Sequence, residues 1–78
     1  MGTDTAHFEQ SRFEWRRRYQ KALQQLHRWH GAMGAKNPIT RGYALELIHA
    51  GDMIGPTHGK LARHRVEHLF GTGQRLAA

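Results

Sequence analysis

The sequence has no cysteine and no long apolar run, and each absence excludes a class of protein. Without cysteine, the chain can form neither a disulfide framework nor a thiolate metal site. The first ten residues have neither a basic start nor an apolar stretch, so we expect no signal peptide and no membrane span. We therefore expect a cytoplasmic protein that needs no cofactor and no membrane.

Acidic residues are also few, since six Asp and Glu stand against twelve Lys and Arg in 78 residues, a formal net charge of +6. A chain this basic favours an anionic partner, which can be DNA, RNA, or an anionic surface of a protein or ribonucleoprotein. The length fits one small domain over residues 1–78. Its small core gives only marginal stability, which a homodimer could increase. We expect residues 1–5 and 72–78 to be frayed.

Apolar residues recur with helical spacing in three segments, which predicts a small all-α domain of three helices. The first is a long amphipathic helix from about residue 6 to residue 33, and residues 31–38 form a linker. Thr40 would cap the second helix, which would end near Ala50 because Gly51 can close it in a left-handed conformation. The third would run from Pro56 to Phe70. The side chains expected to face inward are Phe8, Trp15, Tyr19, Ala22, Leu26, Trp29 and Met33, then Tyr43, Ala44, Leu47 and Ile48, then Leu61, Ala62, Val66, Leu69 and Phe70.

The opposite side of the first helix is predicted to be basic and exposed to solvent. Phe13 lies off the apolar face, where its ring could stack on a base or pack against another chain. The alternative is a solvated face on which Glu14 supports Arg18 four residues later. The candidate binding cations of this helix are Arg16, Arg17, Lys21 and Arg28, with Arg18 at the edge.

A glycine-rich turn would join the second and third helices between Gly51 and Pro56. Backbone N–H groups in such a turn, and in the first turn of the next helix, have no partner inside the helix and lie at the positive end of its dipole. These groups could therefore bind a phosphate. The candidate binding residues in and around this turn are Arg41, Gly55, Thr57, Gly59, Lys60, Arg63 and His64.

The run from Leu47 to Leu61, with the form L-I-x-x-G-x-x-x-G-P-x-x-G-x-L, resembles the helix-hairpin-helix element. It is also similar to a segment in the C-terminal, tRNA-contacting part of CCA-adding nucleotidyltransferases. Both families use this element on nucleic-acid backbones without reading sequence. The usual hairpin reads Gly-hydrophobic-Gly, and Met53-Ile54-Gly55 keeps the hydrophobic residue and the second glycine but lacks the first. The resemblance implies binding to the backbone of DNA or RNA.

Residues 64–68 have the form H-x-x-E-H, in which two His residues four apart on a helix can bind zinc. An enzyme of that kind needs a third ligand and a cleft, and a chain of this size without cysteine offers little of either. No phosphate-binding loop with its lysine and no nucleophile elbow occurs in the sequence. We therefore expect neither a metal site nor catalysis.

Together these patterns predict a non-catalytic protein that binds nucleic acid through phosphates with little sequence preference. A helix-turn-helix whose third helix reads base edges fits less well, because its turn is shorter than the segment from Gly51 to Pro56. The alternative is a small phage- or plasmid-type inhibitor or adaptor that docks on a host protein or ribonucleoprotein complex. Arg, Trp and Tyr, which interfaces favour, are frequent in the first helix and support that alternative.

Overall fold

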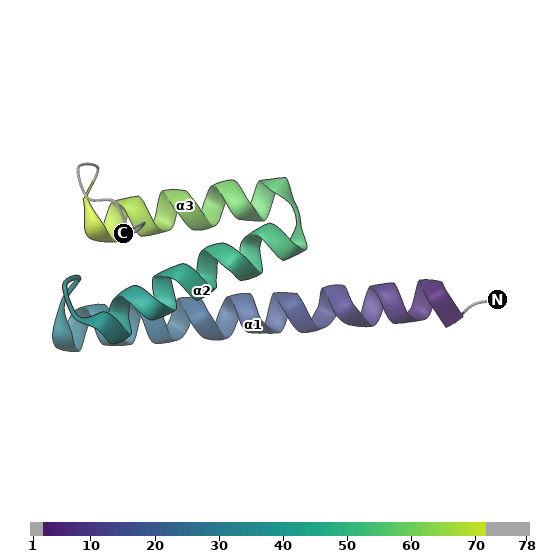
Figure 1. The fold of residues 1–78 in the computed structure, drawn as a ribbon, viewed down its shortest axis with the longest axis horizontal. Coiled ribbons are helices and arrows are strands. Elements are labelled where there is room, and N and C mark those ends of the chain that lie inside the picture. Colours follow the sequence, from purple (N-terminus) through teal and green to yellow (C-terminus); the bar gives the residue numbers. More distant parts are fainter. Residues whose placement is uncertain (1–2, 72–78) are drawn as a thin grey trace.

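A computed structural model describes the backbone of residues 3–71 and the side chains from Ser11 to Gly71. Its helices are α1 (Thr3–Met33), α2 (Pro38–Ile54) and α3 (Pro56–Phe70), and the described residues contain no strand. Consecutive helices run antiparallel, and in the view of Figure 1 α2 lies between α1 and α3, which also contact each other directly. The prediction of an all-α, three-helix domain is confirmed. The expectations for residues 1, 2 and 72–78, and for the side chain of Phe8, lie outside the described part of the chain.

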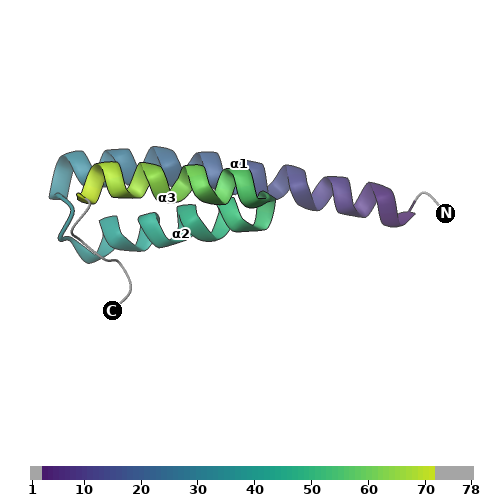
Figure 2. The ribbon, with the colours of Figure 1, turned by 90° about the horizontal axis from the view of Figure 1, so that it is seen from above.

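The first helix is about twice as long as either of the others, and this difference shapes the molecule. It begins at Thr3, earlier than the expected start near residue 6. Its C-terminal half packs along α2, whereas its N-terminal part extends beyond the turn that joins α2 to α3 (Figures 1 and 2). One end of α1 therefore carries no other helix on any side among the described residues.

The core combines small and aliphatic side chains with the aromatic rings of Tyr19 and Phe70, and the three helices contribute equally to it. Most of the predicted inward-facing residues are buried or half-buried, but Met33 is 57% exposed and Leu61 is 41% exposed, so these two predictions were wrong. Met33 is the last residue of α1, and beside Leu61 the buried positions of α3 are the small residues Gly59 and Ala62. The buried hydrophobic residues are Tyr19, Ala22, Leu26, Ala44, Leu47, Ala50, Ala62, Val66 and Phe70.

The second helix begins earlier than the sequence suggested. Asn37 is its N-cap, with a side-chain Oδ1 that accepts a hydrogen bond from the Ile39 N–H at 2.9 Å. Pro38 occupies the first helical turn, where its missing N–H costs nothing. Thr40, the predicted cap, is instead fully buried in the interface. Asn and Thr are both good caps, and the position of Pro38 decides between them.

Gly51 does not end α2, which continues to Ile54. A Cβ atom at Gly51 would lie 2.8 Å from the backbone oxygen of His58, so α2 and α3 come into backbone contact at this glycine. The connection between the helices is Gly55 alone. The expected turn from Gly51 to Pro56 is therefore wrong, because Gly51 serves helix packing rather than helix termination. The predicted end of α3 at Phe70, followed by Gly71 with φ of 88°, is confirmed.

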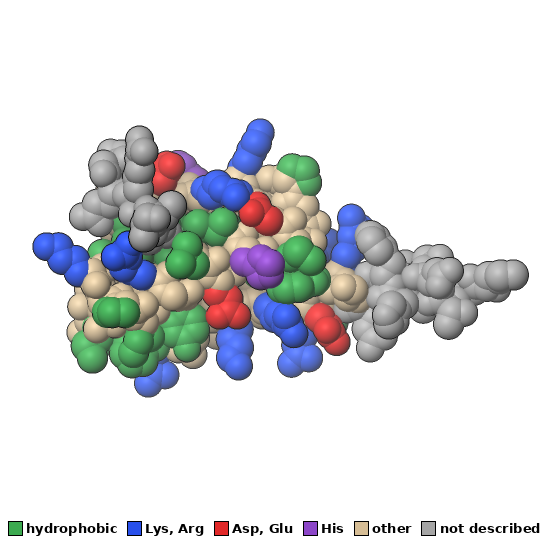
Figure 3. Space-filling model, in the orientation of Figure 1, with side chains coloured by type: hydrophobic (Ala, Val, Ile, Leu, Met, Phe, Trp, Pro, Cys, Tyr) green, Lys and Arg blue, Asp and Glu red, His purple; other side chains and the backbone are tan. Residues whose placement is uncertain are grey.

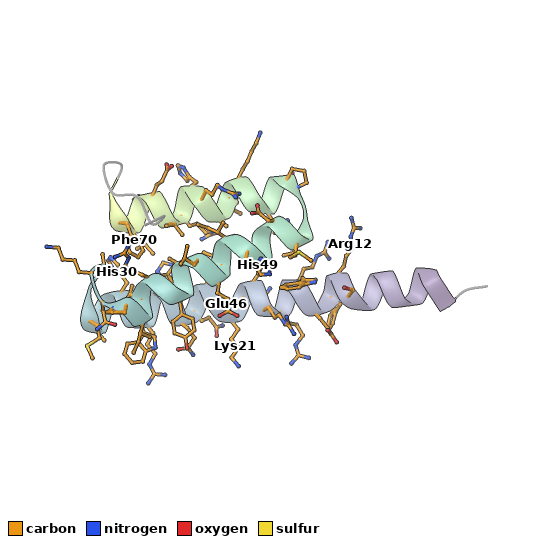
Figure 4. All side chains as sticks on the ribbon, in the orientation of Figure 1. Arg12, Lys21, His30, Glu46, His49 and Phe70 are labelled. Carbon is orange, nitrogen blue, oxygen red and sulfur yellow. The ribbon has the colours of Figure 1, made fainter. Side chains whose placement is uncertain are left out.

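Histidine side chains make several of the contacts that hold the helices together. The rings of His49 and Trp15 meet edge to face at 5.3 Å between centroids, and those of His58 and Tyr19 at 5.6 Å. His30 lies against Phe70, where the two helix ends meet (Figure 4), and its Nε2 lies 3.0 Å from the Leu69 carbonyl oxygen, to which it donates a hydrogen bond. These contacts orient α1, and with it the cations on its outer side.

Candidate nucleic-acid interface

The part of α1 that packs in the bundle is strongly and uniformly basic. From Trp15 to Met33 the sequence contains no Asp or Glu. All the Lys and Arg side chains of this segment are exposed, as predicted for the solvent side of the helix. These cations are Arg16, Arg17, Arg18, Lys21 and Arg28.

Three of these cations form a line along the outer face of α1. Arg17, Lys21 and Arg28 are separated by four and seven residues, which places them on the same side of an α-helix. The line is roughly 16 Å long, from the rise of about 1.5 Å per residue. Lys21 points away from the bundle (Figure 4), and Lys and Arg side chains project along the edge of the molecule that α1 forms (Figure 3).

The cations in this line are not neutralised by any described side chain. No carboxylate of the described residues lies within ion-pairing distance of Arg17, Lys21 or Arg28. Arg18 places its guanidinium over the ring of Trp15, 4.7 Å from the ring centroid, and does not form the ion pair with Glu14 that the alternative interpretation expected. The line therefore presents its charge to an external anion.

An open depression of about 420 Å³ lies beside this line and is lined by Glu14, Arg17, Arg18 and Lys21. A second, of about 330 Å³, lies between α1 and α2, where Glu46 stands opposite Lys21 and Arg18. Each depression thus includes one carboxylate in its lining. In the groove between the helices Glu46 would repel an anion, whereas the first depression has three cations beside its one carboxylate, so the outer face of α1 is the better phosphate surface.

Phe13 lies on the same outer side as the cations, one helical turn before Arg17. Its side chain is 61% exposed, the largest value among the exposed large hydrophobic residues of the described chain. The prediction that Phe13 lies off the apolar face is confirmed. The face of α1 that carries it includes Gln20 and Gln24, whose amides can donate and accept hydrogen bonds. An aromatic ring, amides and unpaired cations are thus arranged on one helix face.

The second group of candidate residues lies around the joint of α2 and α3, away from the α1 line. Arg63 donates hydrogen bonds to both oxygens of the Asp52 carboxylate, at 2.6 and 2.8 Å, and its Nη1 donates also to the Gly59 carbonyl oxygen at 3.2 Å. A Cβ atom at Gly59 would overlap with the Asp52 carboxylate. The prediction that Arg63 supplies free charge to a phosphate is therefore corrected, since this bidentate ion pair occupies it.

The Asp52–Arg63 pair was not predicted from the sequence. The two residues are eleven positions apart and belong to different helices. Had α2 ended near Ala50, Asp52 would have been in a loop. Only the continuation of α2 to Ile54 sets its carboxylate beside the first turns of α3.

The hydrogen bonds from Arg63 hold the pKa of the Asp52 carboxyl below its ordinary value of 3.8. Desolvation has a smaller effect that raises this pKa, and the charges of Arg63 and His49 have smaller effects that lower it. Because the folded protein lowers this pKa, the pair stabilises the fold above pH 3.8 and loses its effect as the pH falls through the lowered value.

Arg63→Met should return the pKa of the Asp52 carboxyl towards 3.8, as measured by NMR titration of the Asp52 carboxyl carbon. Lys60→Met, which removes a neighbouring cation of α3, should not change it. An Asp52 pKa that is the same with and without Arg63 would contradict this assignment.

The backbone donors expected at this turn are mostly occupied. The Gly55 N–H donates to the Gly51 carbonyl at 3.1 Å, and the Gly59 N–H donates to the Gly55 carbonyl at 2.9 Å. Pro56 has no N–H, so only Thr57 and His58 retain the unpaired donors of a helix start. The turn is therefore a poorer phosphate site than a glycine hairpin would be.

The remaining candidates are spread over two helices. Lys60 and His64 are exposed on α3, and Arg41 is half-buried on α2. The α3 cations and the α1 line belong to helices that lie at opposite edges of the bundle in the view of Figure 1, although the two helices also touch through His30 and His58. The structure thus separates the predicted residues into two sets rather than one continuous surface.

No group of three or more His, Asp or Glu side chains within the described part of the chain is arranged to hold a metal ion. His64 and His68 are exposed on α3, while His30 is engaged with the Leu69 carbonyl. No described helix is long and apolar enough to cross a membrane.

Comparison with known proteins finds no relative of this chain. No protein family, no curated protein and no solved structure matches the chain. The function must therefore be inferred from the geometry and charge of the chain itself.

Proposed function

We propose that the protein binds nucleic acid without catalysis, through phosphate contacts along the outer face of α1. The observation that carries this proposal is the line of Arg17, Lys21 and Arg28, which are exposed and unpaired on a segment with no acidic residue. Flanking charge comes from Arg16 and Arg18.

Phosphates are the anions that best fit such a line. Guanidinium groups bind phosphate with two parallel hydrogen bonds, and a row of cations matches a polymer whose charges repeat along its length. Contacts of this kind are insensitive to base sequence, because every nucleotide carries the same phosphate. The proposal therefore includes little sequence preference and strong dependence on salt.

Within this proposal, the joint of α2 and α3 has a secondary role. Its backbone donors at Gly55 and Gly59 are paired within the chain, and Arg63 is bound to Asp52. Lys60 remains exposed and adds to the positive potential that attracts the polymer, and His64 is exposed on the same helix. The resemblance to helix-hairpin-helix elements supports binding to a nucleic-acid backbone, and the surface that we propose for this binding is α1.

Lys21→Ala and Lys60→Ala form a matched pair that tests which surface binds. Each removes one exposed cation, so their effects on net charge are equal. Lys21→Ala should weaken binding to all sequences and lower the slope of log affinity against log salt by about 0.7 for a single strand or about 0.9 for a duplex. Lys60→Ala should change the slope little. The measurement is fluorescence anisotropy of labelled single-stranded DNA, duplex DNA and structured RNA over a range of salt concentrations.

Two results would count against the proposal. Equal losses in the two variants would mean that net charge alone matters, and a loss only in Lys60→Ala would assign binding to the joint of α2 and α3. Circular dichroism of each variant checks that the helices are retained, as expected for exposed positions.

A second candidate function, docking on a protein or ribonucleoprotein complex, is favoured by the outer face of α2. Ile39, Leu45 and Met53 are 46%, 51% and 49% exposed there. A Cβ atom added at Gly42, on the same helix, would meet no other atom within 4 Å, so the surface around it is open. Exposed apolar residues on one helix face are a common feature of interaction surfaces. If none of the labelled nucleic acids binds even at low salt, the phosphate proposal fails and this candidate takes its place.

A further inference from the structure

The exposed ring of Phe13 needs an explanation that phosphate binding alone does not provide. A phenyl ring that is 61% exposed gains little from packing within the chain, and it lies at one end of the line of cations. It cannot contact a phosphate favourably, because it has no hydrogen-bond donor. Its flat face can stack on a nucleic-acid base.

A base is available for stacking on a side chain only when it is unpaired. In a duplex, each base is covered above and below by its neighbours, so a phenyl ring can stack on a base only by forcing two stacked base pairs apart, which costs free energy. In a single strand, the bases can turn out from the backbone and lie on aromatic rings while the phosphates follow a basic surface. The combination of Phe13 with Arg17 and Lys21 therefore favours a single strand over a duplex.

The spacing along α1 agrees with this arrangement. Phe13, Arg17 and Lys21 follow one another at intervals of four residues, which is about 6 Å along the helix axis for each step. Successive cations in a single line follow one backbone, whereas a helix that lies in a duplex groove meets a strand on each of its two sides. Gln20 and Gln24, on the same face, supply amides that can hydrogen-bond base edges.

We propose that the outer face of α1 binds single-stranded nucleic acid, with one base stacked on Phe13 and the backbone running along Arg17, Lys21 and Arg28. This inference rests on the proposed function and adds to it the kind of nucleic acid. Single-stranded DNA and single-stranded RNA both present unpaired bases joined by phosphates, so both fit this surface.

The experiment compares single strands that carry bases with a strand that lacks them and with a duplex, all of the same length. Labelled oligothymidylate and oligouridylate are titrated with the protein by fluorescence anisotropy, beside an abasic strand and a duplex of the same length. The protein should bind the strands that contain bases more tightly than the duplex and about tenfold more tightly than the abasic strand. The tighter of oligothymidylate and oligouridylate shows which of the DNA and RNA strands the protein prefers.

Phe13→Ala should lower affinity for the base-containing strands by about tenfold while leaving affinity for the abasic strand and the salt slope unchanged. Phe13→Trp should restore the affinity, because a larger ring stacks at least as well. Met33→Ala, at another exposed apolar position of α1, is the matched control and should have no effect. Because Phe13 is exposed, none of these changes should unfold the protein, which circular dichroism checks.

The inference would be overturned if the duplex bound as tightly as the single strands, or if Phe13→Ala weakened the base-containing and abasic strands equally. Either result would leave salt-dependent phosphate binding intact. The proposed function itself fails only if no strand, single or double, binds in a salt-dependent manner.

Discussion

Leu47→Ala is expected to lower the free energy of unfolding by about 2–5 kcal/mol, the range for removing a buried leucine side chain. Leu47 is fully buried in α2, the helix that packs against both of the others. Its truncation leaves a cavity between α2 and its neighbours that small residues such as Ala44 and Ala50 cannot fill. A domain of this size has a total stability on the order of 4–12 kcal/mol, so this one change can remove much of it.

Leu45→Ala is the control, because it removes the same atoms two residues away. Leu45 is 51% exposed on the outer side of α2, and its replacement should change stability by no more than about 0.5 kcal/mol. Urea denaturation followed by far-ultraviolet circular dichroism gives both values. Equal losses at the two positions would mean that the outer side of α2 is covered, for instance by a second copy of the chain.

Gly51→Ala is expected to destabilise the protein by about 1–3 kcal/mol, although alanine is the better helix former. The added Cβ would lie 2.8 Å from the His58 carbonyl oxygen and 3.1 Å from the Ala62 Cβ, so α2 and α3 must move apart. The backbone oxygen belongs to the first turns of α3 and cannot give way as a flexible side chain would. The loss of packing then extends to the Asp52–Arg63 pair, which joins the same two helices.

Gly42→Ala, in the same helix, should have the opposite sign. A Cβ at Gly42 has no neighbour within 4 Å, so only the higher helix propensity of alanine remains, which is worth about 0.5–1 kcal/mol of stabilisation. Both variants are measured by the same urea titrations. Stabilisation by Gly51→Ala would mean that the helices do not approach closely at this point, and Gly51 would then have no role in their packing.

The proposed binding surface depends on α1 as a rigid support. Its outer cations belong to a helix whose inner side is held by Tyr19, Ala22 and Leu26 in the core and by the ring contacts of Trp15 and His30. A line of charges on a packed helix is ordered before the partner arrives, so less conformational entropy is lost on binding. Loss of the core through Leu47→Ala should therefore also weaken any binding by this face.

Local patterns were sufficient to predict the three helices and the outward basic face of α1. Periodic apolar residues identify a helix and its buried side, and an exposed side follows by geometry for Arg17, Lys21 and Phe13. The end of α3 was also predictable, since Gly71 follows the last apolar residue of the pattern. These features depend on residues within a few turns of one another, and the sequence by itself determined them.

Tertiary structure decided the features that join distant residues. Glycine is equally suited to end a helix and to let two helices touch, and only the position of His58 against Gly51 shows which applies. The same packing places Asp52 beside Arg63, so Arg63 is no longer free to bind a phosphate as predicted. The candidate interface is therefore formed mainly by α1. Close approach and charge pairing between helices are properties of their relative placement, which no local pattern encodes.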